Sequence, residues 1–246
     1  MAFSSFGNVE LWNTTDFDTT FDGETQGAGA YLKFHQAAFT PGADAGTLEV
    51  LSARTASGDI VIDVTQGNLV AYDVRAGTAA AADGTITLAT IGSGNLGLGS
   101  VMALGDDVAI GAGVTGNAAP LAVDPAGSGM IYDLNNAEAN VFARNLALVG
   151  ADGIDTDIEI TGTLRALSTD GMIDLYAYAS QDPADADLDV ITIDAGAGQA
   201  FLRTDGTLDL RQGQIVSSTR ITLAADGDIR GNQDDNADIV GGNANA

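Results

Sequence analysis

The sequence predicts an all-β protein, and within that class a parallel β-helix (β-solenoid) with an aromatic-rich N-terminal cap or assembly segment. Short segments that alternate apolar and polar residues recur along the chain, as in Ile60–Val64 and Ile221–Ala224. Glycines separate them at short and similar intervals, as at Gly153, Gly162 and Gly171. Period-two alternation is typical of strands with one buried face, and units that resemble one another favour a solenoid over a sandwich or barrel.

Residues 1–57 differ in composition from the rest. Six of the 8 phenylalanines, the only tryptophan, the only histidine and the only lysine lie before Thr40. The open end of a repeat protein must be covered, so this segment is expected either to cap its own first coil or to mediate assembly with another chain. The candidate assembly residues are Phe3, Phe6, Trp12, Phe17, Phe21, Tyr31 and Phe34.

Residues 58–231 are expected to form the repeat domain, and residues 232–246 a polar C-terminal tail. Asn117–Gly129 and Ser180–Asp189 are expected to leave the stack as loops, because they hold prolines that strands rarely accept. Alternating aliphatic side chains should share one interior column. They are Ile60, Ile62, Leu69, Ile86, Leu88, Ile158, Ile160, Leu208 and Ile221.

Composition excludes several classes of protein. The net charge of −25, from 34 acids against 9 bases, would repel nucleic acid and anionic membrane surfaces. With no cysteine, neither disulfides nor thiolate metal sites can form. No apolar run approaches the roughly 18 residues of a membrane span, and the first residues lack the pattern of a signal peptide.

Four sequence segments resemble the repeats of a known protein family. They are Gly58-Asp-Ile-Val-Ile-Asp-Val, Gly94-Asn-Leu-Gly-Leu-Gly-Ser-Val, Gly105-Asp-Asp-Val-Ala-Ile and Ala225-Asp-Gly-Asp-Ile-Arg-Gly. In its repeat pattern, the region from Gly58 to Gly231 resembles the repeats of filamentous haemagglutinin and related large bacterial exoprotein adhesins. The resemblance implies a right-handed parallel β-helix, export to the cell surface, and work as an adhesin or fibre shaft.

The sequence offers few side chains of the kinds that act as nucleophiles or bases in enzymes. A nucleophilic triad would have to use His35, the single histidine, and cysteine is absent. The alternative to a non-catalytic protein is a carbohydrate-active β-helix enzyme, a polysaccharide lyase or glycoside hydrolase, that uses paired carboxylates. The candidate pairs come from Asp152, Asp155 and Asp157, or from Asp205 and Asp209. Aspartate is also common in turns, where its side chain binds local backbone, so the same residues could be purely structural.

Calcium is the one cofactor that the sequence suggests. Clustered aspartates in flexible loops supply the hard oxygen ligands that Ca²⁺ prefers, and the alternative is solvated acidic loops. The spacing matches neither an EF-hand nor a calcium-binding glycine-rich nonapeptide. The candidate ligands are Asp182, Asp185, Asp187, Asp189, Asp226, Asp228 and Asp234.

Together these observations predict an extracellular structural or adhesive protein without catalysis, located outside the cell or on the bacterial cell surface. Stacked coils would form a stiff rod, and loops would display what the rod binds. The expected partners are further copies of the chain, further coils of a larger adhesin, and glycans of a host or surface, with no nucleic acid and no membrane span.

Overall fold

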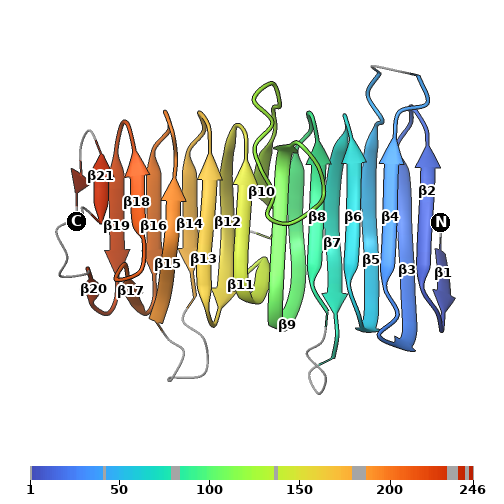
Figure 1. Ribbon diagram of the computed structural model, residues 1–246, viewed down its shortest axis with the longest axis horizontal. Coiled ribbons are helices and arrows are strands. Elements are labelled where there is room, and N and C mark those ends of the chain that lie inside the picture. Colours follow the sequence, from blue (N-terminus) through green and yellow to red (C-terminus); the bar gives the residue numbers. More distant parts are fainter. Residues whose placement is uncertain are drawn as a thin grey trace.

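The protein is built from β-strands that lie side by side along one axis. The computed structural model describes residues 2–40, 43–78, 84–135, 138–178, 187–231, 238–241 and 244–245. Within these residues the chain forms 22 strands and no helix, which confirms the prediction of an all-β fold. In Figure 1 the colour changes steadily from blue at one end to red at the other, so position along the molecule follows position in the sequence.

The strand bounds are as follows. The first half of the chain contains β1 (Ala2–Ser5), β2 (Val9–Thr14), β3 (Thr19–Ala28), β4 (Leu32–Ala37), β5 (Thr47–Ser57), β6 (Ile60–Thr65), β7 (Asn68–Ala76), β8 (Ile86–Ile91), β9 (Leu96–Val114) and β10 (Met130–Asp133). The second half contains β11 (Val141–Gly150), β12 (Gly153–Ile160), β13 (Thr163–Ser168), β14 (Ile173–Ala177), β15 (Asp187–Asp194), β16 (Ala200–Thr204), β17 (Thr207–Asp209), β18 (Gln214–Ser217), β19 (Ile221–Ala225), β20 (Ile229–Arg230), β21 (Ile239–Gly241) and β22 (Ala244–Asn245).

Pairing between these strands is parallel, and it follows three ladders. The first ladder runs through β2, β4, β6, β8, β9, β11, β13, β15, β18 and β21. The second runs through β3, β5, β7, β9, β10, β12, β14, β16, β19 and β22. The third contains β1, the second halves of β3, β5 and β7, residues 100–103 of β9, residues 141–143 of β11 and residues 158–160 of β12. The corresponding position in the later passages is taken by β15, β17 and β20, which pair with one another. The strands of residues 1–57 therefore belong to the same ladders as those that follow.

Some strands pass from the second ladder to the third through a bend. In β5, Val50 and Ala53 are buried while the two residues between them are not, so the alternation of buried and outward residues shifts at this point. The nine residues of β7 have the same burial pattern as the first nine residues of β5. A locally shifted strand of this kind turns sharply while keeping apolar side chains on one side.

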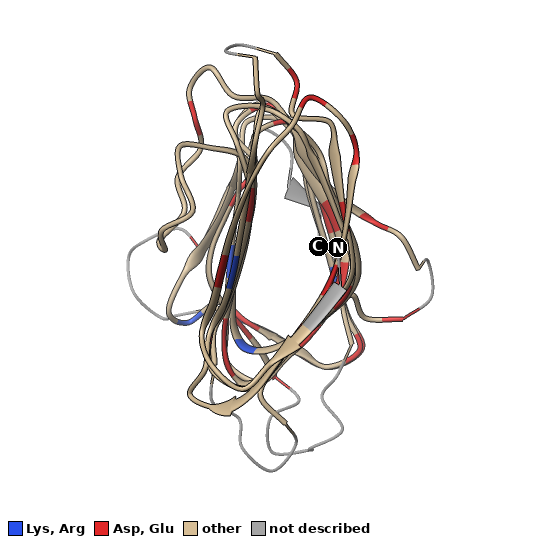
Figure 2. Ribbon diagram, turned by 90° about the vertical axis from the view of Figure 1, so that its right-hand side faces the viewer, with Lys and Arg blue, Asp and Glu red and all other residues tan. Residues whose placement is uncertain are grey.

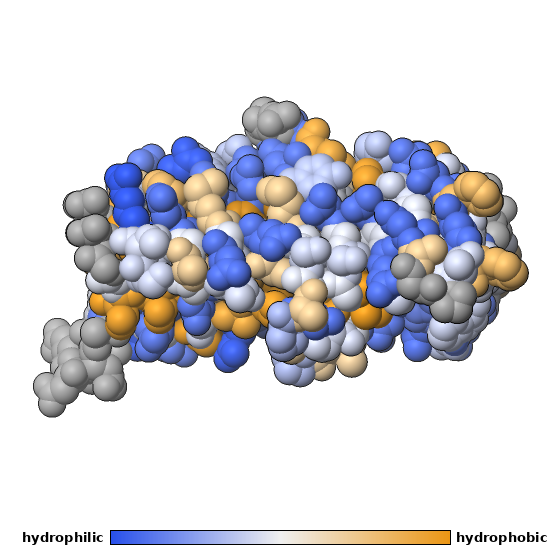
Figure 3. Space-filling model, turned by 90° about the horizontal axis from the view of Figure 1, so that it is seen from above, coloured by the Kyte–Doolittle hydropathy of each residue, from blue (hydrophilic) through white to orange (hydrophobic). Residues whose placement is uncertain are grey.

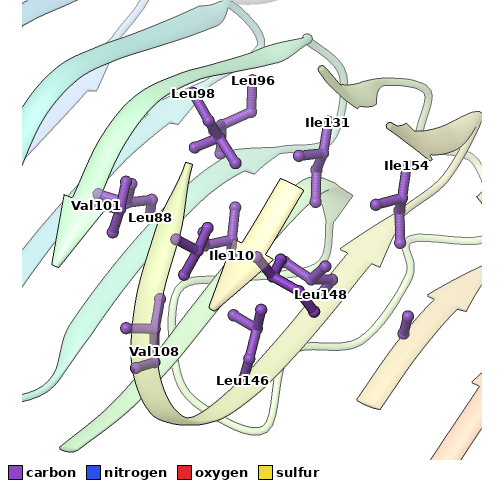
Figure 4. Packing of buried hydrophobic residues seen from close by; sticks show 14 of the residues in the cluster. Leu88, Leu96, Leu98, Val101, Val108, Ile110, Ile131, Leu146, Leu148 and Ile154 are labelled. Carbon is purple, nitrogen blue, oxygen red and sulfur yellow. The ribbon is translucent and has the colours of Figure 1, made fainter. Parts of the chain in front are cut away.

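The interior is a continuous column of aliphatic side chains. All nine residues predicted to face it are buried, with at most 4% of any side chain exposed, so this prediction is confirmed. Viewed along the long axis, the strands enclose a flattened ring, which the buried side chains fill (Figure 2). Figure 4 shows the middle of the column, where Leu88, Ile110 and Leu148 come from successive strands of the first ladder.

Polar side chains at the bends connect each passage of the chain to the next. The Asp59 carboxylate accepts the backbone N–H of Thr85 at 2.9 Å, and the Asn68 amide oxygen accepts that of Asn95 at 2.9 Å. Asp18 accepts the N–H of Thr47 at 2.8 Å in the same way. These bonds give Asp18 and Asp59 a structural role, because each carboxylate holds a backbone N–H of the next passage of the chain.

Asn140 is the most heavily bonded of these polar residues, and it is fully buried. Its Nδ2 donates to the Leu98 carbonyl at 2.8 Å and to Asp133 Oδ1 at 2.7 Å. Its Oδ1 accepts from Thr156 Oγ1 and from the Asp157 N–H, both at 3.0 Å. One side chain thus joins β9, β10 and β12.

We expect Asn140→Ala to lower the free energy of unfolding by about 3 kcal/mol, since several buried polar groups would lose their partner at once. Urea denaturation followed by circular dichroism measures the change. Thr161→Ala, at an exposed position beyond β12, is the control and should change stability by less than about 0.5 kcal/mol. Equal effects of the two substitutions would show that the Asn140 bonds contribute nothing particular.

Candidate functional site

At the N-terminal end of the stack, the outermost described strands have a partner on one side only. Within the described residues β1 pairs only with β3, β2 only with β4, and Thr19–Phe21 only with β5. Each of these strands therefore presents one edge of backbone N–H and C=O groups without a strand partner. Leu11 on β2 packs against the core but is only partly buried, because no further strand covers it. Unpaired edges of this kind accept strands from other molecules.

Large apolar side chains surround this edge. Phe6 is 81% exposed, Trp12 75%, Phe17 78% and Phe39 74%. Phe6 lies between β1 and β2 and Phe17 between β2 and β3, so both mark bends of the first passage through the ladders. Figure 3 shows hydrophobic residues at this end of the molecule. Exposed aromatic side chains around an unpaired strand edge indicate an interaction surface.

The other aromatic residues predicted for assembly have different positions. Phe21 and Phe34 are fully buried in the core, with ring centroids 4.7 Å apart, so neither can contact another molecule while the chain is folded. Tyr31 is half-buried, and the Lys33 ammonium lies 4.8 Å from the centre of its ring. Phe3 lies on β1, and its side chain is outside the described part of the structure. Among the predicted assembly residues, Phe6, Trp12 and Phe17 are those placed to contact a partner.

At the C-terminal end of the stack, too, the outermost described strands have a partner on one side only. Within the described residues β20 pairs only with β17, β21 only with β18, and β22 only with β19. Ile229 is 42% exposed and Val240 is 45% exposed at this edge. Within the described residues, both ends of the stack thus combine unpaired strand edges with apolar side chains that no strand covers.

The residues predicted to bind calcium are separated by the structure. Asp182, Asp185 and Asp234 lie outside the described residues. Arg230 contacts two of the others, with Nη1 2.9 Å from Asp187 Oδ2 and Nη2 3.5 Å from Asp228 Oδ2. Asp226 is exposed beyond β19.

Asp189, the remaining predicted ligand, lies next to Asp209 across the β15–β17 pair. Burial raises the pKa of Asp189, and the Asp209 carboxylate raises it further. In the described part of the chain, no three histidine or acidic side chains form a group that could hold a metal ion.

Asp155 and Asp157, two of the candidate catalytic carboxylates, alternate with buried residues on β12 and lie near Asp133 and Asp174. Burial raises the pKa of both residues, and neighbouring carboxylates raise it further, with Asp174 the main one for Asp155 and Asp133 for Asp157. The two pKa values move in the same direction, so like-charge repulsion is concentrated on this face of β12.

The other candidate carboxylates have identified partners. Asp152 Oδ2 accepts the Gly129 N–H at 2.8 Å, and Asp205 accepts a hydrogen bond from the Tyr176 hydroxyl, which raises the pKa of Tyr176 to about 12. Arg211 Nε donates to both Asp209 oxygens, at 2.9 and 2.6 Å, and these bonds lower the pKa of Asp209. Each of the three carboxylates has a contact that accounts for it structurally.

His35 lies in a row of side chains on the outer face of the first ladder. Its ring centroid is 4.3 Å from that of Trp12, and Nδ1 is hydrogen-bonded to Asp63. Asn117, from the segment between β9 and β10, also donates to Asp63. The row connects the Trp12 ring on β2, through His35, to Asp63 on β6.

None of the described residues belongs to a helix that could cross a lipid bilayer. Comparison of the chain with protein-family models, with curated proteins and with solved structures gives no match.

Proposed function

We propose that the chain is a parallel β-helix that serves as a structural module, assembling end to end into a fibre or adhesive filament outside the cell, and that it is not an enzyme. Three parallel ladders and one apolar column support the β-helix. Its coils would be the successive passages of the chain through the third, first and second ladders. The surface location rests on the resemblance of the repeats to bacterial exoprotein adhesins.

The observation that carries the assembly proposal is the order of the ladders at the two open ends. At the N-terminal end the chain enters the third ladder with β1, the first with β2 and the second with β3. At the other end the last described strands occupy the same ladders in the same order, as β20, β21 and β22. A second copy placed head to tail would therefore continue each ladder without a change of order. Such a heterologous contact does not close, and it propagates into a filament.

The chemistry of the ends favours this contact. In the first ladder, β2 of one copy would lie on β21 of the next, which brings Leu11 against the inward Ile239. Backbone groups at both edges would gain hydrogen bonds, and the exposed side chains of Phe6 and Phe17 would become covered. Fully burying one such ring stabilises a contact by about 1.5–3 kcal/mol.

We expect Leu11→Lys to abolish assembly, because an inward-pointing charge at a strand edge blocks the addition of another strand. Light scattering gives the mass, and negative-stain microscopy gives the particle length at several concentrations. The wild-type chain should form rods of variable length, more readily at high salt, because screening reduces repulsion between copies of charge −25. Leu11→Lys should give single short particles.

Thr14→Lys is the matched control, since it adds the same charge to the same strand at an exposed outward position. It should assemble like the wild type, and circular dichroism should show that both variants remain folded. A wild-type chain that stays monomeric at high concentration and high salt, or filaments that persist in Leu11→Lys, would defeat the proposal.

A further inference from the structure

A pocket of about 470 Å³ opens on the outer face of the first ladder, away from both ends of the stack. Its floor is one row of outward side chains from four adjacent strands, in the order Thr87, Ala109, Ala147 and Arg165. Ala119 and Pro120, from the segment between β9 and β10, form one wall. Ligand pockets for small molecules range from about 300 to 1,000 Å³.

The pocket exists because of two small residues and one anchored segment. Ala109 and Ala147 occupy the middle of the row, so the floor is low between Thr87 and Arg165, which lie about 14 Å apart at an inter-strand spacing of 4.8 Å. The wall is held in place by Leu121, which is 94% buried in a small apolar cluster with Val114 and Val149. The shape is therefore formed before any ligand arrives.

Arg165 is unusual among the basic residues of this chain. Six other arginines form ion pairs with aspartate, and Lys33 and Arg220 lie over aromatic rings. Within the described residues the exposed Arg165 side chain has no such contact, although the chain carries 34 acids and 9 bases. Asp107, the acidic residue of the pocket, is already engaged by Arg144 Nη2 at 3.0 Å and Asn145 Nδ2 at 2.8 Å. The guanidinium of Arg165 is thus available to an anion from solution.

We infer that this pocket binds a sugar unit that carries a carboxylate, such as a uronic acid residue of a polysaccharide. A planar guanidinium matches a carboxylate with two parallel hydrogen bonds. The Thr87 hydroxyl can bond to sugar hydroxyls, while Pro120 and the two alanines can contact the apolar C–H face of the ring. The pocket should prefer a ligand with one negative charge. A ligand with two would be repelled by the net negative charge of the chain, and Arg165 could compensate only one of them.

This inference does not depend on end-to-end assembly, and its test uses the intact chain. Isothermal titration or ligand-observed NMR compares glucuronate, glucose and glucose 6-sulfate as probes. Glucuronate should bind about ten- to a hundred-fold more tightly than glucose, the range expected when a charge-assisted bidentate contact is present in one ligand only. Arg165→Gln should remove that preference, and Ala147→Tyr should abolish binding by filling the floor while leaving the arginine in place.

Arg220→Gln is the matched control, because it removes the same charge from the chain at a residue that does not line the pocket. It should bind glucuronate like the wild type. The inference is overturned if glucuronate does not bind, if it binds no more tightly than glucose, or if Arg165→Gln retains the preference. Stronger binding of glucose 6-sulfate than of glucuronate would overturn the assignment to a carboxylate.

Discussion

Replacing Gly94 with alanine is expected to destabilise the protein by about 3 kcal/mol or more. Gly94 has φ of +141°, a conformation that residues with a Cβ rarely adopt. A Cβ added there would lie 1.9 Å from the Gly67 carbonyl oxygen of the preceding passage of the chain. The Gly94 carbonyl oxygen is itself covered by Gly129, whose own added Cβ would lie 2.1 Å from it. Backbone stacks directly on backbone at this bend, so a side chain can enter only by separating the strands.

Gly116→Ala is the control for Gly94→Ala, because an added Cβ at Gly116 meets nothing within 4 Å. Chemical denaturation of both variants gives the two free energies of unfolding under the same conditions. We expect Gly116→Ala to change stability by less than about 0.5 kcal/mol. A loss for Gly94→Ala no larger than that of Gly116→Ala would mean that the strands do not stack as closely at the bend as the structure has them.

Phe34→Ala is expected to cost about 3–5 kcal/mol. Phe34 is fully buried on β4, where its ring packs against Phe21 and pairs in register with Ile62 on β6 and Leu11 on β2. Removing the ring would leave a cavity beneath the N-terminal edge. Because each strand contacts mainly its neighbours in the ladder, we expect the loss to be concentrated in β1 to β4.

Hydrogen exchange of backbone amides measures where the Phe34→Ala variant opens, and denaturation gives the total loss. Exchange should accelerate strongly in β2 and β4 and little in β16 and β19. Phe201→Ala is the control, since its half-exposed ring lies on the outer face of β16 against Arg220, and it should cost about 1 kcal/mol. Uniform acceleration along the whole chain would contradict the idea of local loss.

Much of the interior could be predicted from the sequence, because period-two alternation places residues such as Ile60 and Ile62 on one side of a strand whichever strand pairs with it. The same rule places Leu32 and Phe34 inside. The prediction of Phe21 and Phe34 as assembly residues, which rests on the aromatic composition of the first residues, is therefore wrong, because both are buried. Alternation within β4 was the stronger signal. Trp12, at an outward position of β2, follows it as well.

The sites outside the core were harder to predict, because they depend on register. Asp59 accepts a hydrogen bond from Thr85, which lies 26 residues further along the chain. Its role therefore depends on the number of residues in one passage through the ladders, and insertions change that number. The pocket needs four strands in register and a segment that folds back over them. The only sequence signal for Arg165 is the scarcity of basic residues, which makes each of them a candidate for binding an anion.

The strands stand across the long axis in Figure 1, so the backbone hydrogen bonds between them run along that axis. A pulling force applied between the two ends would act on these bonds directly, with the three ladders sharing the load at each level and successive levels loaded in series. The strength of such a rod is that of its weakest level. Among the described strands the shortest are β20 and β22, with two residues each, so we expect rupture under tension to begin at the C-terminal end and to leave the central strands intact.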